Sequence, residues 1–238
     1  MKKAKKTGVQ SISKTNRSTK RSIGFGRGMR RVILEDRCLL FFIKNPEKGK
    51  VKTRLASAIG DKMAVKLYKR FLLEMLFTLN GGTFIFYLCY SPESPLSNLK
   101  DWLGDDYLYM PQTGEDLGER MKNGFVEAIS MNFKRVVLIG SDIPDLPLEF
   151  VEEAFTSLRE KDAVIGPSLD GGYYLIGFKN ETFSPRVFDG IHWSTESVFE
   201  KTLKALDREG LAVHTLKPLR DIDTVNDLRI KDLRKKGG

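Results

Sequence analysis

The stretch that most constrains the fold runs from Arg135 to Asp145. Residues 136–139 are apolar without a break, and three of the four are β-branched. Such a run is typical of a strand buried on both faces in the middle of a parallel sheet. It ends at Gly140 and Ser141, and the first charged residue beyond it is Asp142. In an open α/β sheet, ligands bind outside the carboxyl ends of the strands, so Asp142 is either a metal ligand or a turn former.

Further predicted strands and helices alternate at short spacing along the chain. The strands are expected at residues 38–43, 83–90, 107–110, 163–165, 173–178 and 211–216. The helices are expected at residues 61–79, 96–103, 116–129, from 147 onward, at 195–207 and from 224 onward. The alternation predicts an α/β fold, a three-layer sandwich with a mostly parallel sheet.

The net charge of +9 belongs to one end of the chain. Eleven of the 40 Lys and Arg lie in residues 1–34, which contain no acid. The remaining 29 basic and 31 acidic residues give the rest of the chain a net charge of −2. The segment has no periodic apolar face, and we expect residues 1–36 to be a disordered basic tail and 37–238 to be one domain. A short charge run is usually solvated, so nucleic-acid binding is not expected. Met29 is an alternative start, which would place residues 1–28 outside the native protein.

The two cysteines, Cys38 and Cys89, both lie in apolar runs. Two cysteines make neither a disulfide framework nor a usual zinc site, and a reducing cytoplasm is therefore expected. The longest apolar runs fall far short of the roughly 18 residues that a membrane helix requires. No secretory signal is visible, because the N-terminus has no apolar central region.

A basic loop follows the first predicted strand. Lys44, Lys48, Lys50, Lys52 and Arg54 surround Gly49 within eleven residues. These cations repel one another unless an anion lies among them, and Lys and Arg both suit phosphate. Glycine would let the backbone approach the ligand closely. The loop is neither a Walker A motif nor a Rossmann fingerprint, and the alternative interpretation is a solvated surface loop.

Three acidic residues are candidates for one metal site. Asp221 and Asp223 flank a single apolar residue after the last predicted strand. With Asp142 they could share one Mg²⁺ or Mn²⁺, which prefers oxygen ligands and keeps waters for substrate phosphates. The alternative is that Asp223 or Thr224 caps a terminal helix.

Two further loops carry weaker signals. Asp170, Gly171 and Gly172 permit close approach of a ligand, and Asp170 could bind a sugar hydroxyl or an acceptor, although Asp-Gly is also a common hairpin turn. Trp193 could stack on a sugar or a base, while Ser194 or Thr195 is expected to cap the following helix.

Six motifs together resemble a known bacterial family, the radical-SAM/selenodomain-associated transferase 1 group, also called DUF2064. They span residues 39–228 in the expected order. The matching residues are 42–46 with Gly49 and 52–55, 112–121, 140–146, 166–167 with 170–177, 193–195, and 221–224. Many members have a small residue or Cys at the position of Ile143, and this difference bears on the shape of the pocket.

The resemblance implies a GT-A-like nucleotide-diphospho-sugar transferase fold. Residues 52–55 are also similar to the phosphate loop of phospholactate guanylyltransferases. By that likeness Asp142 is a metal ligand, and Lys52 and Arg54 bind the nucleotide phosphates. Together with the metal candidates Asp142, Asp221 and Asp223, the expected site has three further sets. They are Asp142 and Asp170 as catalytic residues; Lys44, Gly49, Lys52, Thr53 and Arg54 for the nucleotide; and Gly171, Gly172 and Trp193 for the substrate.

We therefore expect a cytoplasmic, metal-dependent transferase acting on a nucleotide-activated sugar and an unknown small-molecule acceptor. Metal and loop cations would neutralise charge on the leaving phosphate. Two alternatives stay open: a nucleotidyltransferase that uses a nucleoside triphosphate and releases pyrophosphate, and a non-catalytic nucleotide-binding module.

Overall fold

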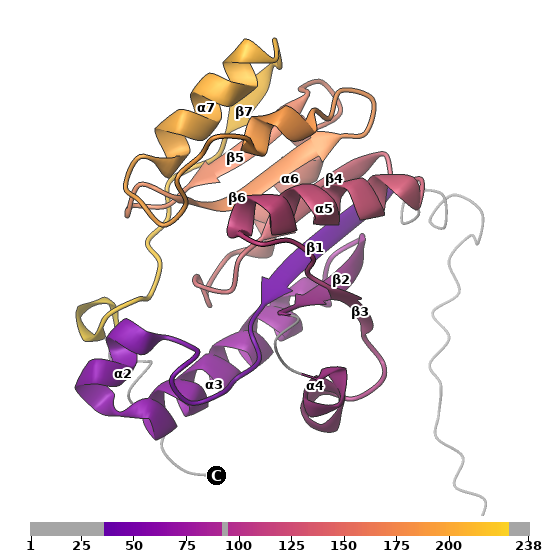
Figure 1. The fold of residues 1–238 in the computed structure, drawn as a ribbon. Coiled ribbons are helices and arrows are strands. Elements are labelled where there is room, and N and C mark those ends of the chain that lie inside the picture. The colour runs from indigo at the N-terminus through magenta and orange to yellow at the C-terminus, as the bar shows by residue number, and fades with distance from the viewer. Residues whose placement is uncertain (1–35, 92–94, 229–238) are drawn as a thin grey trace, which may run out of the picture.

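The protein is described from a computed structural model, which covers residues 36–91 and 95–228. One seven-stranded sheet has the order β3-β2-β1-β4-β6-β5-β7 (Figure 1). The strands are β1 Arg37–Ile43, β2 Ile85–Tyr90, β3 Leu108–Pro111, β4 Arg135–Ile139, β5 Ala163–Pro167, β6 Tyr173–Lys179 and β7 Val213–Thr215. Only β6 runs against its neighbours; the other pairings are parallel. The predicted α/β, mostly parallel fold is confirmed.

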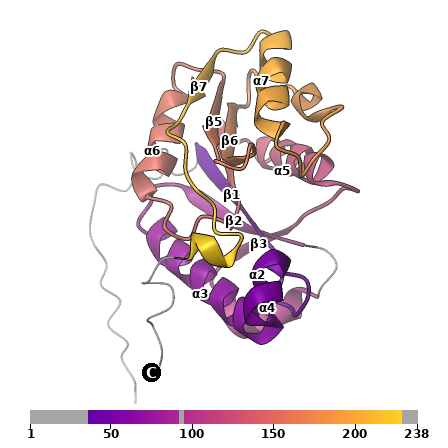
Figure 2. The ribbon, with the colours of Figure 1, turned by 90° about the vertical axis from the view of Figure 1, so that its left-hand side faces the viewer.

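Helices cover both faces of the sheet, as Figure 2 shows from the side. They are α2 Thr53–Ile59, α3 Asp61–Leu79, α4 Leu96–Leu103, α5 Leu117–Ser130, α6 Leu148–Ser157 and α7 Val198–Arg208, with short 3₁₀ helices η1 Pro185–Phe188 and η2 Val225–Asp227. Alternate residues of β1 face opposite sides. Leu39 and Phe41 join the core under α3 and α6, whereas Cys38 and Leu40 join the core under α5 and α7. This is why the apolar strands show no polar alternation.

The core strands occupy the predicted places. Both β1 and β4 are almost wholly buried, and Phe41 pairs with Leu88 of β2 on one side and Ile139 of β4 on the other. Because β1 and β4 are parallel neighbours, their carboxyl ends lie at the same edge of the sheet. The loops beginning at Lys44 and Gly140 therefore start side by side.

Three details of the prediction were wrong. The loop expected at residues 44–55 ends early, because Thr53–Ile59 form α2 and Leu55 packs on Phe71 of α3; Gly60, at φ 81°, separates the two helices. Helix α7 begins at Val198 after Ser197, so neither Ser194 nor Thr195 is its N-cap. The segment from Thr224 forms only a 3₁₀ turn within the described residues, although its Thr224–Asp227 capping box is present.

The predicted basic tail, except for Asp36, lies outside the described residues, as do residues 229–238. In the described ranges, none of the helices is both long and apolar enough to span a membrane.

Candidate functional site

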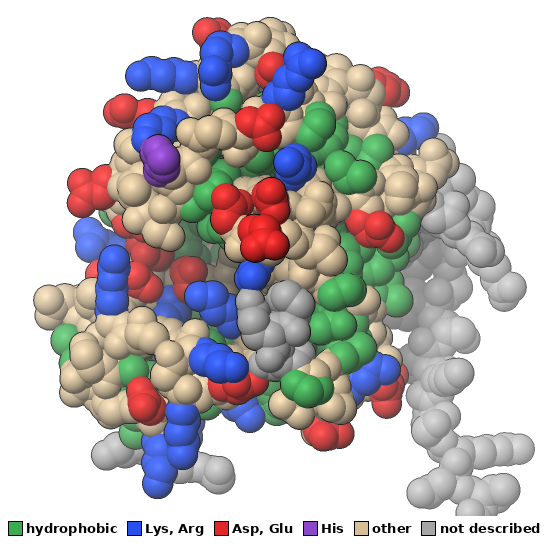
Figure 3. All heavy atoms as spheres, viewed as in Figure 1, with side chains coloured by type: hydrophobic (Ala, Val, Ile, Leu, Met, Phe, Trp, Pro, Cys, Tyr) green, Lys and Arg blue, Asp and Glu red, His purple; other side chains and the backbone are tan. Residues whose placement is uncertain are grey.

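A cleft of about 970 Å³ opens at the carboxyl edge of β1 and β4. The antiparallel strand β6 starts at this edge, so the turn between β5 and β6 lies there as well. The segment after β7 returns to the edge through a bridge between Ser168 and Leu219 and through the Ile222 amide, which donates to the Asp142 carbonyl at 2.9 Å. Topology thus brings four loops, far apart in sequence, into one cleft. On the face drawn in Figure 3, acidic and basic side chains lie next to one another.

The basic loop forms one side of this cleft, which we call the cationic wall. It is lined by Lys44, Lys50, Val51, Lys52, Thr53 and Arg54. Lys44, Thr53 and Arg54 are exposed, in keeping with ligand contact. The structure does not bring Gly49 or Lys48 to the lining; Gly49 instead adopts φ 73° in the turn that precedes Lys50.

Lys52 differs from the other cations because its side chain is only 2% exposed. Its ammonium pairs with Asp142 Oδ1, donates to the Ile222 carbonyl at 2.6 Å and lies 3.7 Å from Asp223 Oδ1. Arg54, by contrast, has a side chain that is 76% exposed and lies 3.3 Å from Asp223 Oδ2. Two cations of the loop are therefore directly paired with carboxylates across the cleft.

The facing side, which we call the acidic wall, contains four carboxylates. Asp142, Asp170, Asp221 and Asp223 all line the cleft and come from three separate segments. The pKa of Asp221 is raised, first by burial and then by the negative charges of Asp170, Asp223 and Asp142. The four carboxylates are thus close enough to repel one another, and the site favours a cation.

Asp170 also has a structural role. Its Oδ1 accepts from the Ser168 hydroxyl at 2.5 Å and from the Gly172 amide at 2.9 Å, which holds the turn between β5 and β6. Gly172 lines the cleft, whereas Gly171 does not. Gly171 has φ 88°, and an added Cβ would lie 2.1 Å from the Glu196 carbonyl oxygen, so glycine is needed there for close packing.

Trp193 connects the cleft lining to α5. An added Cβ at Gly118 would lie 2.3 Å from Trp193 Nε1, so the indole rests directly on the backbone of α5. Ser194, at φ 65°, turns the chain after it, and the Thr195 hydroxyl donates to the His192 carbonyl at 2.9 Å. The indole is therefore held in place and half-buried at the cleft.

Several residues that line the cleft were not predicted as site residues from the sequence. Gln112 is buried, and its Nε2 donates to the Ile43 carbonyl at 3.2 Å and the Cys89 carbonyl at 2.7 Å, joining the ends of β1 and β2. Tyr68 hydroxyl accepts from the Lys44 amide at 2.9 Å and lies 3.1 Å from Ser141 Oγ; burial raises its pKa.

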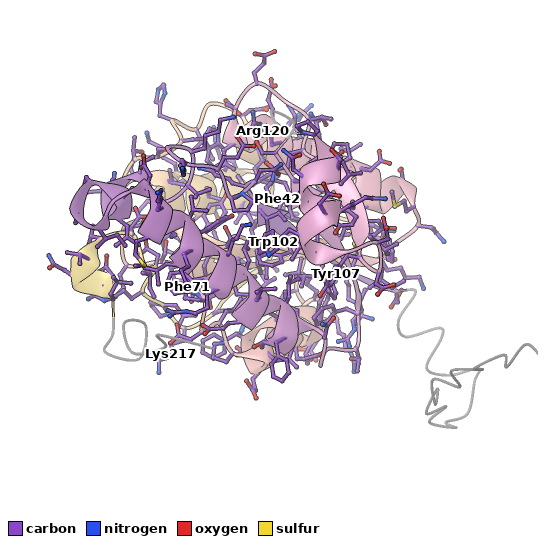
Figure 4. The ribbon with its side chains drawn as sticks, turned by 90° about the horizontal axis from the view of Figure 1, so that it is seen from below. Phe42, Phe71, Trp102, Tyr107, Arg120 and Lys217 are labelled. Carbon is purple, nitrogen blue, oxygen red and sulfur yellow. The ribbon has the colours of Figure 1, made fainter. Side chains whose placement is uncertain are left out.

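Arg120 is a further lining residue, and its Nε donates to the Gly114 carbonyl at 3.1 Å. Phe42 and Arg120 are both labelled in Figure 4, in which the molecule is seen from below. Gln112 and Arg120 lie inside the 112–121 motif that the sequence analysis singled out, so the signal for them was present.

No three His, Cys, Asp or Glu side chains within residues 36–91 and 95–228 are arranged to hold a metal ion. In this part of the cleft the Lys52 ammonium pairs with Asp142 Oδ1 and lies 3.7 Å from Asp223 Oδ1. Carboxylate oxygens, which Mg²⁺ and Mn²⁺ prefer as ligands, are present in the cleft. The Lys52 ammonium is already paired with two of these carboxylates.

Comparison with known proteins identifies the family. A family model described as an uncharacterised protein conserved in bacteria, DUF2064, matches residues 78–195. A solved structure from Desulfovibrio desulfuricans, described as a candidate nucleotide-diphospho-sugar transferase, is 42% identical over 84% of this chain and 89% of that chain, with a TM-score of 0.80. The chain belongs to this DUF2064 family. No curated protein matches it.

More distant structures share only the fold. The 4-diphosphocytidyl-2C-methyl-D-erythritol synthase of Anaerococcus prevotii is 12% identical with a TM-score of 0.53, covering 81% of this chain and 95% of that one. The bifunctional IspDF of Campylobacter jejuni is 12% identical with a TM-score of 0.54, covering 84% of this chain and 54% of that one. The DUF2064 chain therefore has the fold of nucleotide-diphospho-sugar transferases.

Proposed function

We propose that this DUF2064 protein is a metal-dependent transferase that takes a sugar from a nucleotide-activated donor to a small-molecule acceptor. The observation that carries the proposal is the pairing of a cationic wall with an acidic wall across one cleft at the carboxyl edge of the sheet. Donor phosphates need the first wall, and the reacting sugar and acceptor need oxygen acceptors such as those of the second. The name of the Desulfovibrio relative supports the same substrate class.

The cationic wall would bind the donor phosphates. Arg54 is exposed and offers a planar fork that suits a phosphate, and it would exchange its contact with Asp223 for the ligand. Lys44 and Thr53 lie exposed beside it. These groups would stabilise the negative charge that develops on the leaving nucleoside diphosphate.

The acidic wall would serve the sugar and the acceptor. Asp170 Oδ1 is held by Ser168 and Gly172, while its Oδ2 makes no hydrogen bond with the described residues. That oxygen would orient an acceptor hydroxyl and take up its proton as the new bond forms. Trp193, held against Gly118, would pack on the sugar ring.

The residues present fit a divalent ion by donor chemistry. Asp142, Asp221 and Asp223 offer carboxylate oxygens, and the pKa of Asp221 is raised first by burial and then by the negative charges of Asp170, Asp223 and Asp142. When bound there, Mg²⁺ or Mn²⁺ would supply positive charge next to the donor phosphates.

A second candidate is nucleotidyl transfer, in which an acceptor oxygen bonds to the α-phosphorus of a nucleoside triphosphate, the bond from that phosphorus to the β-phosphate oxygen breaks, and pyrophosphate leaves. One observation favours it: Lys44, Lys50, Lys52 and Arg54 all line the cleft, and four cations suit a triphosphate of about −4 charge. The fold shared with a diphosphocytidyl synthase is compatible with either reaction.

One experiment separates these reactions. Nucleoside diphosphate release is measured with each nucleotide sugar, and pyrophosphate release with each nucleoside triphosphate, with Mn²⁺ and with candidate acceptors. Diphosphate release that Asp142→Asn and Arg54→Ala both reduce would support glycosyl transfer. Pyrophosphate released only from a triphosphate would replace it with nucleotidyl transfer. Nucleotide-dependent thermal stabilisation without either product, across the acceptors tried, would favour the non-catalytic module.

A further inference from the structure

The Lys52 ammonium occupies the place where a positive charge is most needed in the acidic wall. It contacts Asp142 and the Ile222 carbonyl and lies within 3.7 Å of Asp223, while only 2% of its side chain is exposed. A lysine buried to this extent normally needs a partner of opposite charge, and here it has two. It neutralises part of the same carboxylate set that the metal would use.

The backbone fixes this lysine rather than leaving it on a mobile arm. Lys52 has φ 47° and ψ 47°, the left-handed region that a residue other than glycine seldom adopts. On one side Val51 is buried, and on the other the Lys52 carbonyl accepts the Ala56 amide at 2.7 Å as α2 begins. Surrounding structure thus imposes the conformation that directs the side chain between the two carboxylates.

Two cations cannot both bind these carboxylate oxygens with full affinity. A divalent ion bound to both Asp142 and Asp223 would lie a few ångströms from the ammonium or displace it, and either arrangement costs free energy. We propose that Lys52 is a resident counter-cation that competes with a divalent metal ion for Asp142 and Asp223.

The competition has a consequence for ligand binding, which rests on the proposed function. A donor phosphate at the cationic wall would offer Lys52 a new anionic partner and release the two carboxylates to the metal. Metal and nucleotide would then each increase the affinity for the other, as reciprocal coupling requires. The competition itself involves the metal alone.

The test measures binding of Mn²⁺ to the full chain without nucleotide, from the free Mn²⁺ signal in electron paramagnetic resonance. Lys52→Met removes the charge and keeps most of the apolar volume. Lys52→Gly removes the charge and suits the left-handed backbone, so it guards against a folding defect in the first variant. Both should bind Mn²⁺ about tenfold or more tightly than the unchanged chain.

Two matched variants make the result specific. Lys50→Met removes one charge from the same loop, but the Lys50 ammonium pairs with Glu47 at 2.8 Å, so Mn²⁺ affinity should stay within about twofold. Adding Asp142→Asn to Lys52→Gly should abolish the gain, because one of the two ligands is then neutral.

Unchanged or weaker Mn²⁺ binding in both folded Lys52 variants would overturn the proposal, as would an equal gain in Lys50→Met. Tighter binding in a folded Lys52 variant that depends on Asp142 would support it. Because no donor or acceptor is present, this result is independent of the transferase assay. Failure of the proposed function would appear only as missing product release.

Discussion

The two walls of the cleft carry opposite charge but differ in how each charge is compensated. On the cationic wall, Lys52 and Arg54 both contact carboxylates across the cleft. On the acidic wall, Asp142 and Asp223 share those contacts, whereas Asp170 and Asp221 form no ion pair within the described residues. The pKa of Asp221 is raised, first by its burial and then by the negative charges of Asp170, Asp223 and Asp142.

This difference gives each wall a different response to substitution. Removing one partner of a cross-cleft pair leaves a buried or half-buried charge without its counter-charge, which destabilises the fold. Removing an uncompensated acid relieves repulsion instead. A phosphate ligand must also compete with Asp223 for Arg54, so part of its binding free energy replaces an existing contact. The predictions below test this contrast from the largest expected effect to the smallest.

Asp142→Asn should have the largest effect. It keeps the side-chain size but leaves the buried Lys52 ammonium with a weaker partner, and we expect the free energy of unfolding to fall by about 2–3 kcal/mol. Urea unfolding at neutral pH measures this loss. The same variant should no longer show Mn²⁺-dependent thermal stabilisation by nucleotide.

A double-mutant cycle with Lys52→Met provides the control for Asp142→Asn. If the pair is coupled, the double variant should be more stable than the sum of the two single losses predicts. Additive losses would mean that the two side chains do not interact energetically. Undiminished metal dependence in Asp142→Asn would reject Asp142 as a ligand.

Arg54→Ala should weaken nucleotide binding by about 1.5–3 kcal/mol, the usual value for a charge-assisted hydrogen bond. Lys48→Ala is the matched control, because Lys48 is an exposed cation of the same loop that does not line the cleft. Isothermal titration calorimetry with each nucleotide compares them. Equal losses in both variants would show that the loop acts through its overall charge and not through a direct Arg54 contact.

Gly118→Ala should displace Trp193 in the cleft without unfolding the chain. The new Cβ would lie 2.3 Å from Trp193 Nε1, so the indole must move, while alanine favours helix α5 by up to about 1 kcal/mol. We expect a shifted tryptophan fluorescence spectrum and sugar-nucleotide binding weaker by about 1 kcal/mol.

Gly124→Ala is the control on the same helix. Its added Cβ would meet Leu40 and Phe42 at 3.4 Å, close to ordinary van der Waals contact. This variant should leave the fluorescence spectrum and ligand binding unchanged. If the two alanine variants behave identically, the contact between Trp193 and Gly118 has no role in ligand binding.

Most of the sheet could be predicted because burial on both faces leaves a direct trace in the sequence. The unbroken apolar runs of β1 and β4 and the Pro and Gly residues after them mark both the strand and its end. Helix α2 could not be predicted in the same way. It is only seven residues long, and its burial depends on Phe71 and Ile222 from distant segments.

The site could be predicted as a set of loops but not as a set of contacts. Residues 44–54, 142, 170 and 221–223 carry charges at strand ends, and topology alone brings strand ends together. That Lys52 would be buried against Asp142 depends on its left-handed backbone and on the return of the chain at Ile222, which no local pattern specifies. Gln112 lies in the 112–121 motif but was missed as a site residue, because its amide carries no charge and its contacts with the ends of two strands appear only in the fold.

Asp221→Asn should have the smallest effect and the opposite sign. The pKa of Asp221 is raised in the folded chain, chiefly by burial and next by Asp170, so the folded state favours the protonated form. Its ionisation therefore costs stability once the pH rises above the ordinary Asp value of about 3.9, and the full cost is reached above the raised pKa. At neutral pH the variant should be more stable than the unchanged chain by a few tenths of a kcal/mol, roughly the size of an exposed charge interaction.

Asp227 provides the matched contrast six residues away. Its pKa is lowered, first by the Thr224 hydroxyl, so its ionised form contributes stability that is present above about pH 3.9 and is lost as the pH falls through the lowered value. Asp227→Asn should therefore destabilise the chain at neutral pH, by about 1 kcal/mol for a lost cap. Urea unfolding between pH 3 and 8 should show two differences of opposite sign that both shrink in acid. A loss of stability in Asp221→Asn at neutral pH would mean that Asp221 has a cationic partner and that the acidic wall is compensated like the cationic one.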